Sequence, residues 1–496
     1  MKNKCSSEEL LRSSDLVNPF VHRLELTTTY EKLKAGLLTV VVLPLRLFII
    51  VSLLVIAWCL AVLGLIGLSE EDLVNKPLIG WRRKVKELIA WIMRLTYHAG
   101  GMSVVVKGKQ ASRKEAPILV IAPHSTFLDA VIVYVTGFPS IIVRTESGNN
   151  PWLGKIINYT QPIYVRREDH DSRAKTIQDI ITRVNSEQDW SQILIFPEGT
   201  CTNRSCLITF KAGAFYPGVP IQPVLIRYPN KLDTVTWTWE GPGVLKLMWL
   251  TLVQPQSTCE IEFLPVYKPS AEEQADPKLY AHNVRQLMAK TLGIPTLDYT
   301  YADCKLVSRA KKLNYSQTLP LLQTHQLRVK LGLSRTQIED KLVSENPQLL
   351  TGPGKMVTYT QFAKLMNISH KDPLLEDLFY LYDKEGSGLM DLKEYLLSVV
   401  LVNRSETKLE MIRLGFEVCG DKLNKRDFCL VLRLVLVLET EELERIFASV
   451  DTAAKGKITY SQFEDYAKNK PEFSTIYGNV LRRLSLPRDF DETKTK

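Results

Sequence analysis

The feature that most constrains this sequence is an apolar run from Leu37 to Leu68, which is interrupted by Pro44 and Arg46. The uncharged part, Leu47 to Leu68, would be about 33 Å long as an α-helix, close to the bilayer hydrocarbon thickness of about 30 Å. A soluble buried helix this long and uniform is rare, so we predict that the run is embedded in a membrane. Lysines and arginines flank it on both sides and give no orientation. A single signal-anchor span and a re-entrant hairpin bent near Pro44 both remain open.

Two further segments combine apolar and aromatic residues. Residues 78–97 predict a basic amphipathic helix, in which Trp81 and Trp91 suit the headgroup boundary of a membrane. Packing of this helix on the core of a catalytic domain is the alternative. The aromatic stretch at residues 237–250 has the same two interpretations, a surface that faces lipid or a part of the core.

Between residues 116 and 269, short apolar runs alternate with longer helical patterns, which is typical of an α/β layered domain. We predict one helix at Ser172–Asn185 and an end to this domain near Leu292. The strands are predicted at residues 118–122, 140–145, 162–166, 192–196, 221–227 and 259–266.

A histidine follows the first of these strands and is followed five positions later by a carboxylate. The strand-like run ends at Pro123, and His124 and Asp129 lie in the turn that comes next. A histidine at a strand end can take a proton from a hydroxyl group, and a nearby carboxylate can fix its tautomer. We therefore predict a base and an orienting residue at these two positions.

Composition excludes several other classes of function. The net charge of +9 suits an anionic headgroup region or a phosphate-rich co-substrate, and it is too diffuse to indicate nucleic acid binding. The 8 cysteines are scattered without zinc-ligand spacing, which is typical of thiols in a reducing compartment. The sequence contains no glycine-rich phosphate loop.

Four blocks occur in an order that is specific to one superfamily. They are His124 to Asp129, Ile163 to Arg167, Phe196 to Cys201 and Val219 to Val224. With them the chain resembles the glycerolipid acyltransferase superfamily. The Glu-Gly-Thr-Cys sequence, the Phe-Lys-x-Gly-Ala that follows it and the hand-like carboxy-terminal part resemble the lysophosphatidylcholine acyltransferase branch. The resemblance covers most of residues 70–475.

The resemblance implies roles for two groups of residues. His124 would be the general base and Asp129 its orienting partner, with direct attack by the lipid hydroxyl and no acyl-enzyme at Ser125. Arg167 at a strand end would grip the phosphate of the acceptor, since a guanidinium binds phosphate through two parallel bonds.

The loop that follows the strand at residues 192–196 would contact the substrates. Glu198, Gly199 and Thr200 would form the floor on the acceptor side. Cys201 stands where phosphatidate-forming relatives carry Arg or Ser, and the loss of a cation there fits a zwitterionic headgroup. Arg204 and Lys211 are predicted as further phosphate or coenzyme A contacts, with ordinary surface charges as the alternative.

The carboxy-terminal part carries one intact EF-hand signature, from Asp383 to Glu394. Gly388 permits the sharp turn of the loop. A second loop at residues 451–462 lacks most ligands, and hand-like remnants lie at residues 357–362 and 416–428. We predict paired hands in which one site binds calcium. The six predicted ligands are Asp383, Glu385, Ser387, the carbonyl of Leu389, Asp391 and Glu394.

We therefore predict an α/β acyltransferase domain, a mixed sheet flanked by helices, between a membrane helix and an all-α EF-hand domain. The predicted segments are a polar amino terminus at 1–35, a membrane anchor at 36–68, the acyltransferase domain at 69–300, the EF-hand domain at 301–475 and a polar tail at 476–496. By resemblance, the protein is a membrane-bound enzyme that transfers an acyl group from acyl-CoA to the sn-2 hydroxyl of lysophosphatidylcholine. It would use calcium at one site and no prosthetic group, and its partners would be phospholipid membrane and its substrates.

By resemblance, the enzyme could also transfer acetyl from acetyl-CoA to lyso platelet-activating factor. Two alternatives stay open from the sequence, and the first is an acyltransferase that acts on lysophosphatidate or glycerol-3-phosphate. A non-catalytic, calcium-responsive membrane scaffold belongs to a different class. The resemblance implies the endoplasmic reticulum membrane, with the Golgi apparatus, plasma membrane or lipid droplets as further locations.

Overall fold

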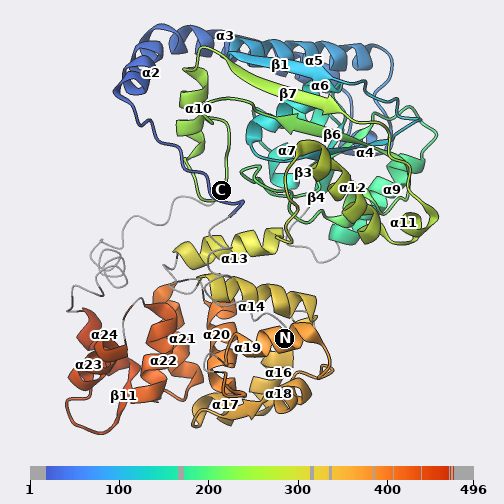
Figure 1. Cartoon of the computed structure of the whole chain (residues 1–496). Coiled ribbons are helices and arrows are strands. Elements are labelled where there is room, and N and C mark those ends of the chain that lie inside the picture. Colours follow the sequence, from blue (N-terminus) through green and yellow to red (C-terminus); the bar gives the residue numbers. More distant parts are fainter. Residues whose placement is uncertain are drawn as a thin grey trace. The chain divides into compact units, whose positions relative to one another are not determined.

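The chain forms two compact units, Met1–Cys304 and Lys305–Lys496, in the computed structural model (Figure 1). Arg167 and Glu385, two of the predicted site residues, lie outside the described residues. The structure describes residues 18–165, 172–312, 318–333, 338–383, 386–405, 407–436, 438, 440–468, 470 and 473.

A seven-stranded mixed sheet forms the centre of the first unit, in the order β1-β7-β6-β2-β5-β3-β4. Neighbouring strands are parallel except β6 and β7, which are antiparallel. The predicted strands are confirmed, with small changes at their ends. The bounds are β1 Met102–Lys107, β2 Ile118–Ala122, β3 Ser140–Arg144, β4 Ile163–Val165, β5 Ile193–Ile195, β6 Ile221–Arg227 and β7 Ser257–Phe263.

The edge strand β1 was not predicted. It lies outside the stretch in which apolar runs alternate with helical patterns, and its last three residues are exposed. A strand that pairs on one side and is half exposed lacks the continuous apolar run of the central strands. The sheet therefore has one more strand than the sequence analysis predicted.

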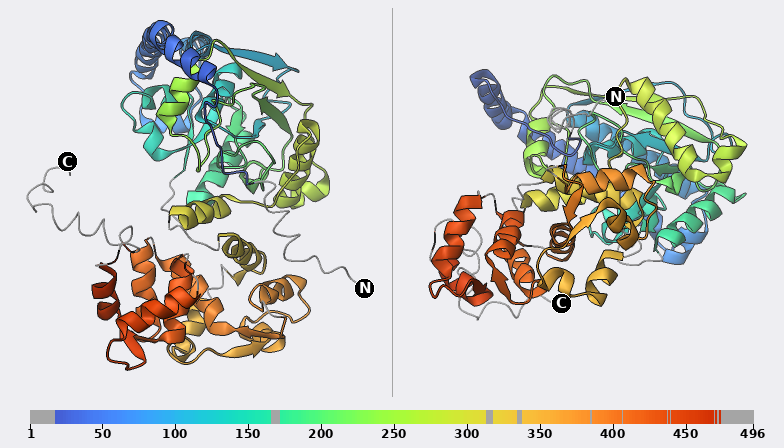
Figure 2. Two further views of the ribbon diagram at one scale, coloured as in Figure 1. Left: turned by 60° about the vertical axis from the view of Figure 1, so that its left-hand side comes forward. Right: turned by 60° about the horizontal axis from the view of Figure 1, so that its bottom comes forward.

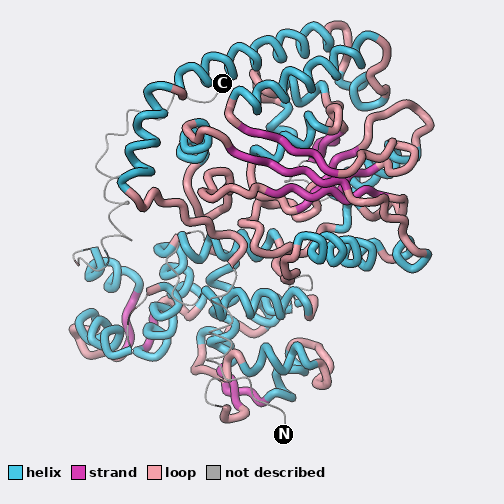
Figure 3. The backbone as a smooth tube through the Cα atoms, turned by 45° about the horizontal axis from the view of Figure 1, so that its top comes forward, coloured by secondary structure: helices cyan, strands magenta, loops and turns pink. Residues whose placement is uncertain are grey.

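Strand β2 lies in the middle of the sheet and is buried on both faces. Leu119 and Ile121 belong to a core shared with helices α3 (Leu43–Leu65) and α5 (Trp81–Ala99), whereas Ile118 and Val120 belong to a core shared with α12 (Pro277–Leu292). Helices therefore cover both faces of the sheet, as the views in Figures 2 and 3 show. This layering confirms the predicted α/β fold of the first unit.

The apolar run forms two helices, α2 (Thr29–Val41) and α3 (Leu43–Leu65), and Pro44 lies in the first turn of α3. The chain changes direction between the two helices (Figures 1 and 3). Helix α3 packs along α5 (Trp81–Ala99) through small residues. Helix α3 also packs against α8 (Gly154–Tyr159), where a Cβ atom at Gly64 would collide with the ring of Tyr159, so glycine permits this second close approach.

Arg46, the charge that interrupts the apolar run, caps helix α10 (Val244–Leu252). Its guanidinium donates to the carbonyl oxygens of Leu252 and Gln254, each at 2.6 Å, and of Pro255 at 2.8 Å. Carbonyls at the end of a helix lack partners within the helix, and a cation there satisfies them. Arg46 therefore ties the start of α3 to the end of α10.

Within the described residues, α3 is the helix that is long and apolar enough to cross a membrane. Much of its surface and that of α2 is exposed and apolar, for example Val40 at 76% and Phe48 at 72%. On α5, Ile89 and Met93 are buried while Trp91 is exposed. Helix α5 therefore does pack on the core, and its other face presents an aromatic residue to the surroundings.

Helices and short 3₁₀ turns complete the first unit. Helix α9 has the predicted bounds, Ser172–Asn185. The others are α4 Glu70–Asn75, η1 Phe127–Ala130, α6 Val131–Val135, α7 Thr145–Gly148, α8 Gly154–Tyr159, η2 Ala212–Ala214, α11 Ala271–Ala275 and α12 Pro277–Leu292. Helix α13, Tyr301–Lys312, begins in the first unit and ends in the second.

The second unit is helical, with two small antiparallel ribbons. Ribbon β8–β9 joins Met356–Thr358 to Leu389–Asp391, and ribbon β10–β11 joins Lys422–Asn424 to Lys457–Thr459 (Figure 3). Each strand lies between two helices, so the predicted remnants and loops form two pairs of helix–loop–helix segments. The helices are α14 Thr318–Lys330, α16 Ile338–Glu345, α17 Gln348–Thr351, α18 Tyr359–Leu365, α19 Pro373–Tyr380, α20 Leu392–Arg404, α21 Lys408–Val418, α22 Lys425–Val435, α23 Thr440–Val450 and α24 Tyr460–Lys468.

Candidate active site

The carboxyl ends of three neighbouring strands meet at the candidate site. Strand β2 pairs in parallel with β5 on one side and with β6 on the other. His124 follows β2, Glu198 follows β5 and Tyr228 follows β6. Parallel pairing therefore brings together side chains that lie far apart in the sequence.

His124 and Asp129 form the predicted pair. The His124 Nδ1 atom lies 2.9 Å from Asp129 Oδ2, and the Asp129 side chain is fully buried. The same oxygen accepts the backbone N–H groups of Ser125 at 2.7 Å and Thr126 at 3.1 Å. The other oxygen, Oδ1, accepts the hydroxyl of Tyr228 at 2.7 Å. The carboxylate is thus held in one orientation toward the imidazole.

The second ring nitrogen of His124 lies beside Cys201. Its Nε2 atom is 3.6 Å from the Cys201 sulfur, and the ring stacks on Phe196 with a centroid distance of 4.2 Å. The His124 side chain remains 23% exposed. Burial alone would lower the pKa of His124, but the neighbouring Cys201 sulfur and the Asp129 carboxylate together raise it well above its ordinary value.

Glu198 is buried and binds the backbone of His124. Its Oε2 atom accepts the His124 N–H at 2.6 Å, and its Oε1 atom accepts the N–H of Ile208 at 3.3 Å. Burial raises the pKa of Glu198 to about 7, although the two N–H donors act in the opposite direction. The N–H of Thr202 also donates to the His124 carbonyl at 2.8 Å. The loop after β5 therefore clamps the residue that carries the imidazole.

Gly199, Thr200 and Lys211 lie within the same loop region. Gly199 has a φ angle of +65°, and a Cβ atom there would collide with the Lys211 side chain. The Lys211 ammonium lies over the ring of Tyr301 at 5.0 Å. The hydroxyl of Thr200 accepts the indole N–H of Trp239 at 2.9 Å. The sharp turn at Gly199 thus leaves room for a lysine close to the backbone.

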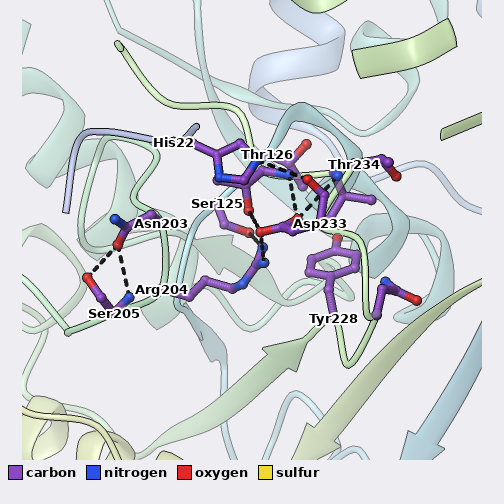
Figure 4. Close-up of polar contacts among 12 residues, drawn as sticks. His22, Ser125, Thr126, Asn203, Arg204, Ser205, Tyr228, Asp233 and Thr234 are labelled. Carbon is purple, nitrogen blue, oxygen red and sulfur yellow. Dashed lines mark hydrogen bonds and ion pairs between the residues drawn. The ribbon is translucent and has the colours of Figure 1, made fainter. Parts of the chain in front are cut away.

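The Arg204 side chain is hydrogen-bonded to other residues of the protein. Its guanidinium donates to Ser125 Oγ at 3.0 Å and to the Asp233 carboxylate at 2.6 Å (Figure 4). It also lies over the ring of Tyr228 at 5.3 Å. In this arrangement both terminal nitrogens of the fork are used by protein groups. The predicted role of Arg204 in binding phosphate stays a prediction.

The structure brings together all the predicted site residues of the first unit that it describes, and it adds two that the sequence did not single out. Tyr228 contacts Asp129, and Asp233 contacts Arg204. Neither belongs to a recognisable motif. The one signal for Tyr228 is its place directly after β6, the strand formed by the fourth block.

The predicted calcium loop lies in the second unit and is described in part. Ser387 Oγ lies 3.1 Å from Asp383 Oδ1 and 3.3 Å from the carbonyl oxygen of Leu389, so three predicted ligands converge. Asp391 Oδ2 accepts Arg426 at 2.7 Å. Among the residues described, no cluster of three or more His, Cys, Asp or Glu side chains is positioned to hold a metal ion.

Comparison with known proteins identifies the family. The acyltransferase family model matches residues 103–227. A lysophosphatidylcholine acyltransferase from Drosophila melanogaster is 42% identical over 93% of this chain and 87% of its own length. Human lysophosphatidylcholine acyltransferase 1 is 42% identical over 93% of this chain and 86% of its own, and human lysophosphatidylcholine acyltransferase 2 is 38% identical over 96% and 88%. This chain belongs to the lysophosphatidylcholine acyltransferase family.

Membership of the family agrees with the geometry. The chain is an O-acyltransferase whose catalytic fold is the mixed sheet described above. The matched residues begin in β1 and end at the last residue of β6, so they include His124, Asp129 and the loop after β5. The long apolar helix α3 near the amino terminus fits a membrane anchor.

Proposed function

We propose that this enzyme transfers an acyl group from acyl-CoA to the sn-2 hydroxyl of lysophosphatidylcholine, with His124 as general base. The observation that carries the proposal is the contact of His124 Nδ1 with a fully buried carboxylate, which leaves Nε2 as the ring nitrogen that can accept a proton, on a side chain that is 23% exposed. The acceptor is inferred from the names of the relatives that match most of the chain. Both the geometry and the relatives therefore support the same reaction.

The chemistry follows from the two ring nitrogens. Nε2 of His124 takes the proton of the lipid hydroxyl while its oxygen forms a bond to the thioester carbonyl carbon. The carbon–sulfur bond then breaks, and the imidazolium returns the proton to the departing coenzyme A thiolate. Asp129 accepts the Nδ1–H and stabilises the imidazolium. A well-placed general base contributes about 10²–10⁴-fold in rate.

The substrates carry phosphate groups that cationic side chains would bind. We propose Arg167, Arg204 and Lys211 for these contacts, and the loop from Glu198 to Cys201 for the acceptor side. Lys211 lies directly over the turn at Gly199, which supports its place beside this loop. Since Glu198 binds the backbone of His124, we propose that it shapes the acceptor side by fixing this backbone.

One contact favours a second reaction path on the same site. Cys201, His124 and Asp129 form a chain of contacts, with the sulfur 3.6 Å from Nε2. In this path the thiol gives its proton to His124 and attacks the acyl-CoA carbonyl, the carbon–sulfur bond to coenzyme A breaks, and His124 returns the proton to the departing coenzyme A thiolate, which leaves a thioester on the enzyme. The lipid hydroxyl then attacks that thioester and regenerates the thiol.

Initial-rate kinetics with both substrates varied separate the two paths. Direct attack in a ternary complex gives intersecting double-reciprocal lines, whereas an acyl-enzyme gives parallel lines and exchange of labelled coenzyme A into acyl-CoA without acceptor. We expect intersecting lines and no exchange. Parallel lines with exchange would replace direct attack by the Cys201 path.

The substrate assignment is tested by a matrix of donors and acceptors with the purified enzyme, with and without calcium. The donors are long-chain acyl-CoA and acetyl-CoA, and the acceptors are lysophosphatidylcholine, lyso platelet-activating factor, lysophosphatidate and glycerol-3-phosphate. We expect the largest kcat/KM for long-chain acyl-CoA with lysophosphatidylcholine. Preference for an anionic acceptor would contradict the role given to Cys201, and no product with any pair would support the scaffold alternative.

We further propose that α2 and α3 anchor the enzyme in the endoplasmic reticulum membrane, and that the Golgi apparatus, plasma membrane or lipid droplets are secondary locations. The exposed apolar surface supports this, for example Phe48 at 72% and Leu63 at 57%. Replacement of both by Asp should release the enzyme from membranes washed with carbonate. A control replacement of Leu279 by Asp on α12 should leave it bound, and equal retention of both variants would contradict the anchor.

The EF-hand domain and its calcium site are also proposals. Asp383 supports them because its carboxylate accepts the N–H groups of Ser387 at 2.9 Å and Gly388 at 2.8 Å, which closes the loop around it. Asp451 repeats this pattern with Lys455 and Gly456 at 2.9 and 2.7 Å. The second loop therefore keeps the same turn, although Lys455 and Gln462 replace ligands there.

Calorimetry of the full chain tests the calcium site. Glu394→Gln removes the proposed bidentate ligand and should abolish tight binding of calcium. Asp451→Asn alters the corresponding loop that lacks ligands and should leave the affinity unchanged. Unchanged affinity in Glu394→Gln would contradict the ligand assignment.

A further inference from the structure

Tyr228 lies directly after β6, beside the loop that carries His124 and Asp129. Strand β6 pairs in parallel with β2, so the chain reaches the same edge of the sheet at both positions. The Tyr228 side chain points into this loop, and the residue is 7% exposed. Its hydroxyl donates to Asp129 Oδ1 at 2.7 Å.

The two oxygens of Asp129 have different partners. Oδ2 accepts His124 Nδ1–H and the backbone N–H groups of Ser125 and Thr126. Oδ1 accepts Tyr228. A buried carboxylate oxygen without a donor is costly, because the group has lost its hydration. The phenol therefore fixes the rotation of the carboxylate that presents Oδ2 to the imidazole.

Tyr228 is itself held in place by its neighbours. The Arg204 guanidinium lies over its ring, and Arg204 is fixed by Asp233 and by the hydroxyl of Ser125 (Figure 4). A cation over an aromatic face is attracted by the ring quadrupole. Burial raises the pKa of Tyr228 well above its ordinary value, so the hydroxyl remains a donor at neutral pH.

We propose that Tyr228 is a positioning residue of the acyl transfer reaction, which acts through Asp129 and sets the strength with which His124 accepts a proton. This inference rests on the proposed roles of His124 and Asp129. Donation by Tyr228 draws negative charge from the carboxylate and moderates its effect on the imidazole. Without the phenol, Oδ1 loses its donor while Oδ2 keeps its contacts, and the charge that faces His124 is less shielded.

The test is Tyr228→Phe in the purified full-length enzyme. We expect kcat to fall about ten- to a hundredfold, the range for a hydrogen bond to a charged group, with little change in KM for either substrate. The acid limb of the kcat/KM profile should move to higher pH. Fluorotyrosine at position 228 keeps the ring and is a stronger hydrogen-bond donor, so it should move the acid limb to lower pH. This second variant tests the inference even if Tyr228→Phe does not fold.

Tyr280→Phe is the matched control. Tyr280 is fully buried on the opposite face of the sheet, and its hydroxyl donates to the carbonyl of Val219 at 2.9 Å. Loss of that bond should affect thermal stability and leave kcat and the pH profile unchanged. If Tyr228→Phe also leaves kcat and the pH profile unchanged, or if fluorotyrosine does not move the acid limb, Tyr228 is a structural residue and the inference is wrong.

A double-mutant comparison separates this inference from the proposed function. In an Asp129→Asn background, Tyr228→Phe should cause little further loss, because a residue that acts through Asp129 has lost its target. Full additivity of the two losses would overturn the inference while leaving His124 as the base. Undiminished activity of Asp129→Asn itself would instead overturn the proposed function.

Discussion

The backbone N–H of His124 donates to the Glu198 carboxylate at 2.6 Å, across the boundary between β2 and β5. This bond joins the two most distinctive blocks of the sequence, which are 74 residues apart. It fixes the peptide that carries the imidazole and leaves the ring to contact Asp129. A displacement of about 1 Å in an active site can cost about a hundredfold in rate, so a contact that fixes the backbone of the base supports catalysis.

Replacement of Glu198 should therefore lower kcat, although Glu198 does not contact the reacting atoms. Glu198→Ala leaves the N–H groups of His124 and Ile208 without their acceptor, and we expect a loss of about a hundredfold or more in kcat together with a lower Tm. Glu198→Gln keeps one acceptor oxygen and should lose less. Steady-state kinetics and thermal unfolding measure both. Equal activity of Glu198→Ala and the parent enzyme would contradict the role of Glu198 in fixing the backbone of His124.

Glu198 also predicts a change of stability with pH. Its pKa is about 7 in the folded protein and 4.5 as the ordinary value, so between these values the folded state binds more protons than the unfolded state. The contribution of this group to stability therefore decreases as pH rises from about 4.5 to about 7. Glu198→Gln should remove that slope from a plot of Tm against pH. A parallel plot for the variant would contradict the assignment.

The acid limb of the profile of kcat/KM against pH should report the protonation of His124. Because the pKa of His124 is raised, its neutral form, which accepts the proton, is populated only at a pH well above 6.5. We expect kcat/KM to rise with pH through this region. Asp129→Asn should lower the midpoint and reduce kcat/KM by about a hundredfold or more. An unmoved midpoint in Asp129→Asn would indicate that another group titrates.

Cys201→Ala should shift the same limb in a defined direction. The Cys201 sulfur is the largest of the contributions that raise the pKa of His124, so its removal should move the limb to lower pH. If the lipid hydroxyl attacks directly, Cys201 is not the base, and we expect kcat to stay within about tenfold of the parent. Loss of a general base would lower kcat by about 10²–10⁴-fold. Complete loss of activity in Cys201→Ala but not in Cys201→Ser would instead indicate that a nucleophile is needed at this position.

Arg46 should matter for stability more than for membrane insertion. Arg46→Leu makes the apolar run more apolar but removes the donor to three carbonyl oxygens at the end of α10. We expect a loss of about 1–3 kcal/mol in the free energy of unfolding, with full retention in the membrane fraction. Arg46→Lys should lose less. Thermal unfolding in detergent, followed with a dye that does not react with thiols, measures this loss. An unchanged Tm in Arg46→Leu would contradict the prediction.

The sequence predicts the central strands well because they are buried on both faces. The bounds of β2 and β6 agree with residues 118–122 and 221–227. Such strands are continuous apolar runs, and turns with proline mark their ends. The pair of His124 and Asp129 was predictable because both residues lie in one loop, within five positions.

The order of strands in the sheet could not be predicted, and the missed site residues depend on it. Tyr228 reaches Asp129 because β6 lies beside β2, although 99 residues separate the two side chains. The contact of Glu198 with the His124 backbone has the same origin, since β5 lies on the other side. Arg46 likewise interrupts an apolar run in the sequence, and only the packing of α3 beside α10 shows its partners.

Acyl transfer from a long-chain acyl-CoA to lysophosphatidylcholine by purified His124→Ala is the decisive measurement for His124 as the general base. Circular dichroism and Tm should confirm that the variant is folded, and Tyr280→Phe serves as a second folded reference. A general base at position 124 predicts a fall in kcat of about 10²–10⁴-fold. Turnover within a few-fold of the parent enzyme would contradict it.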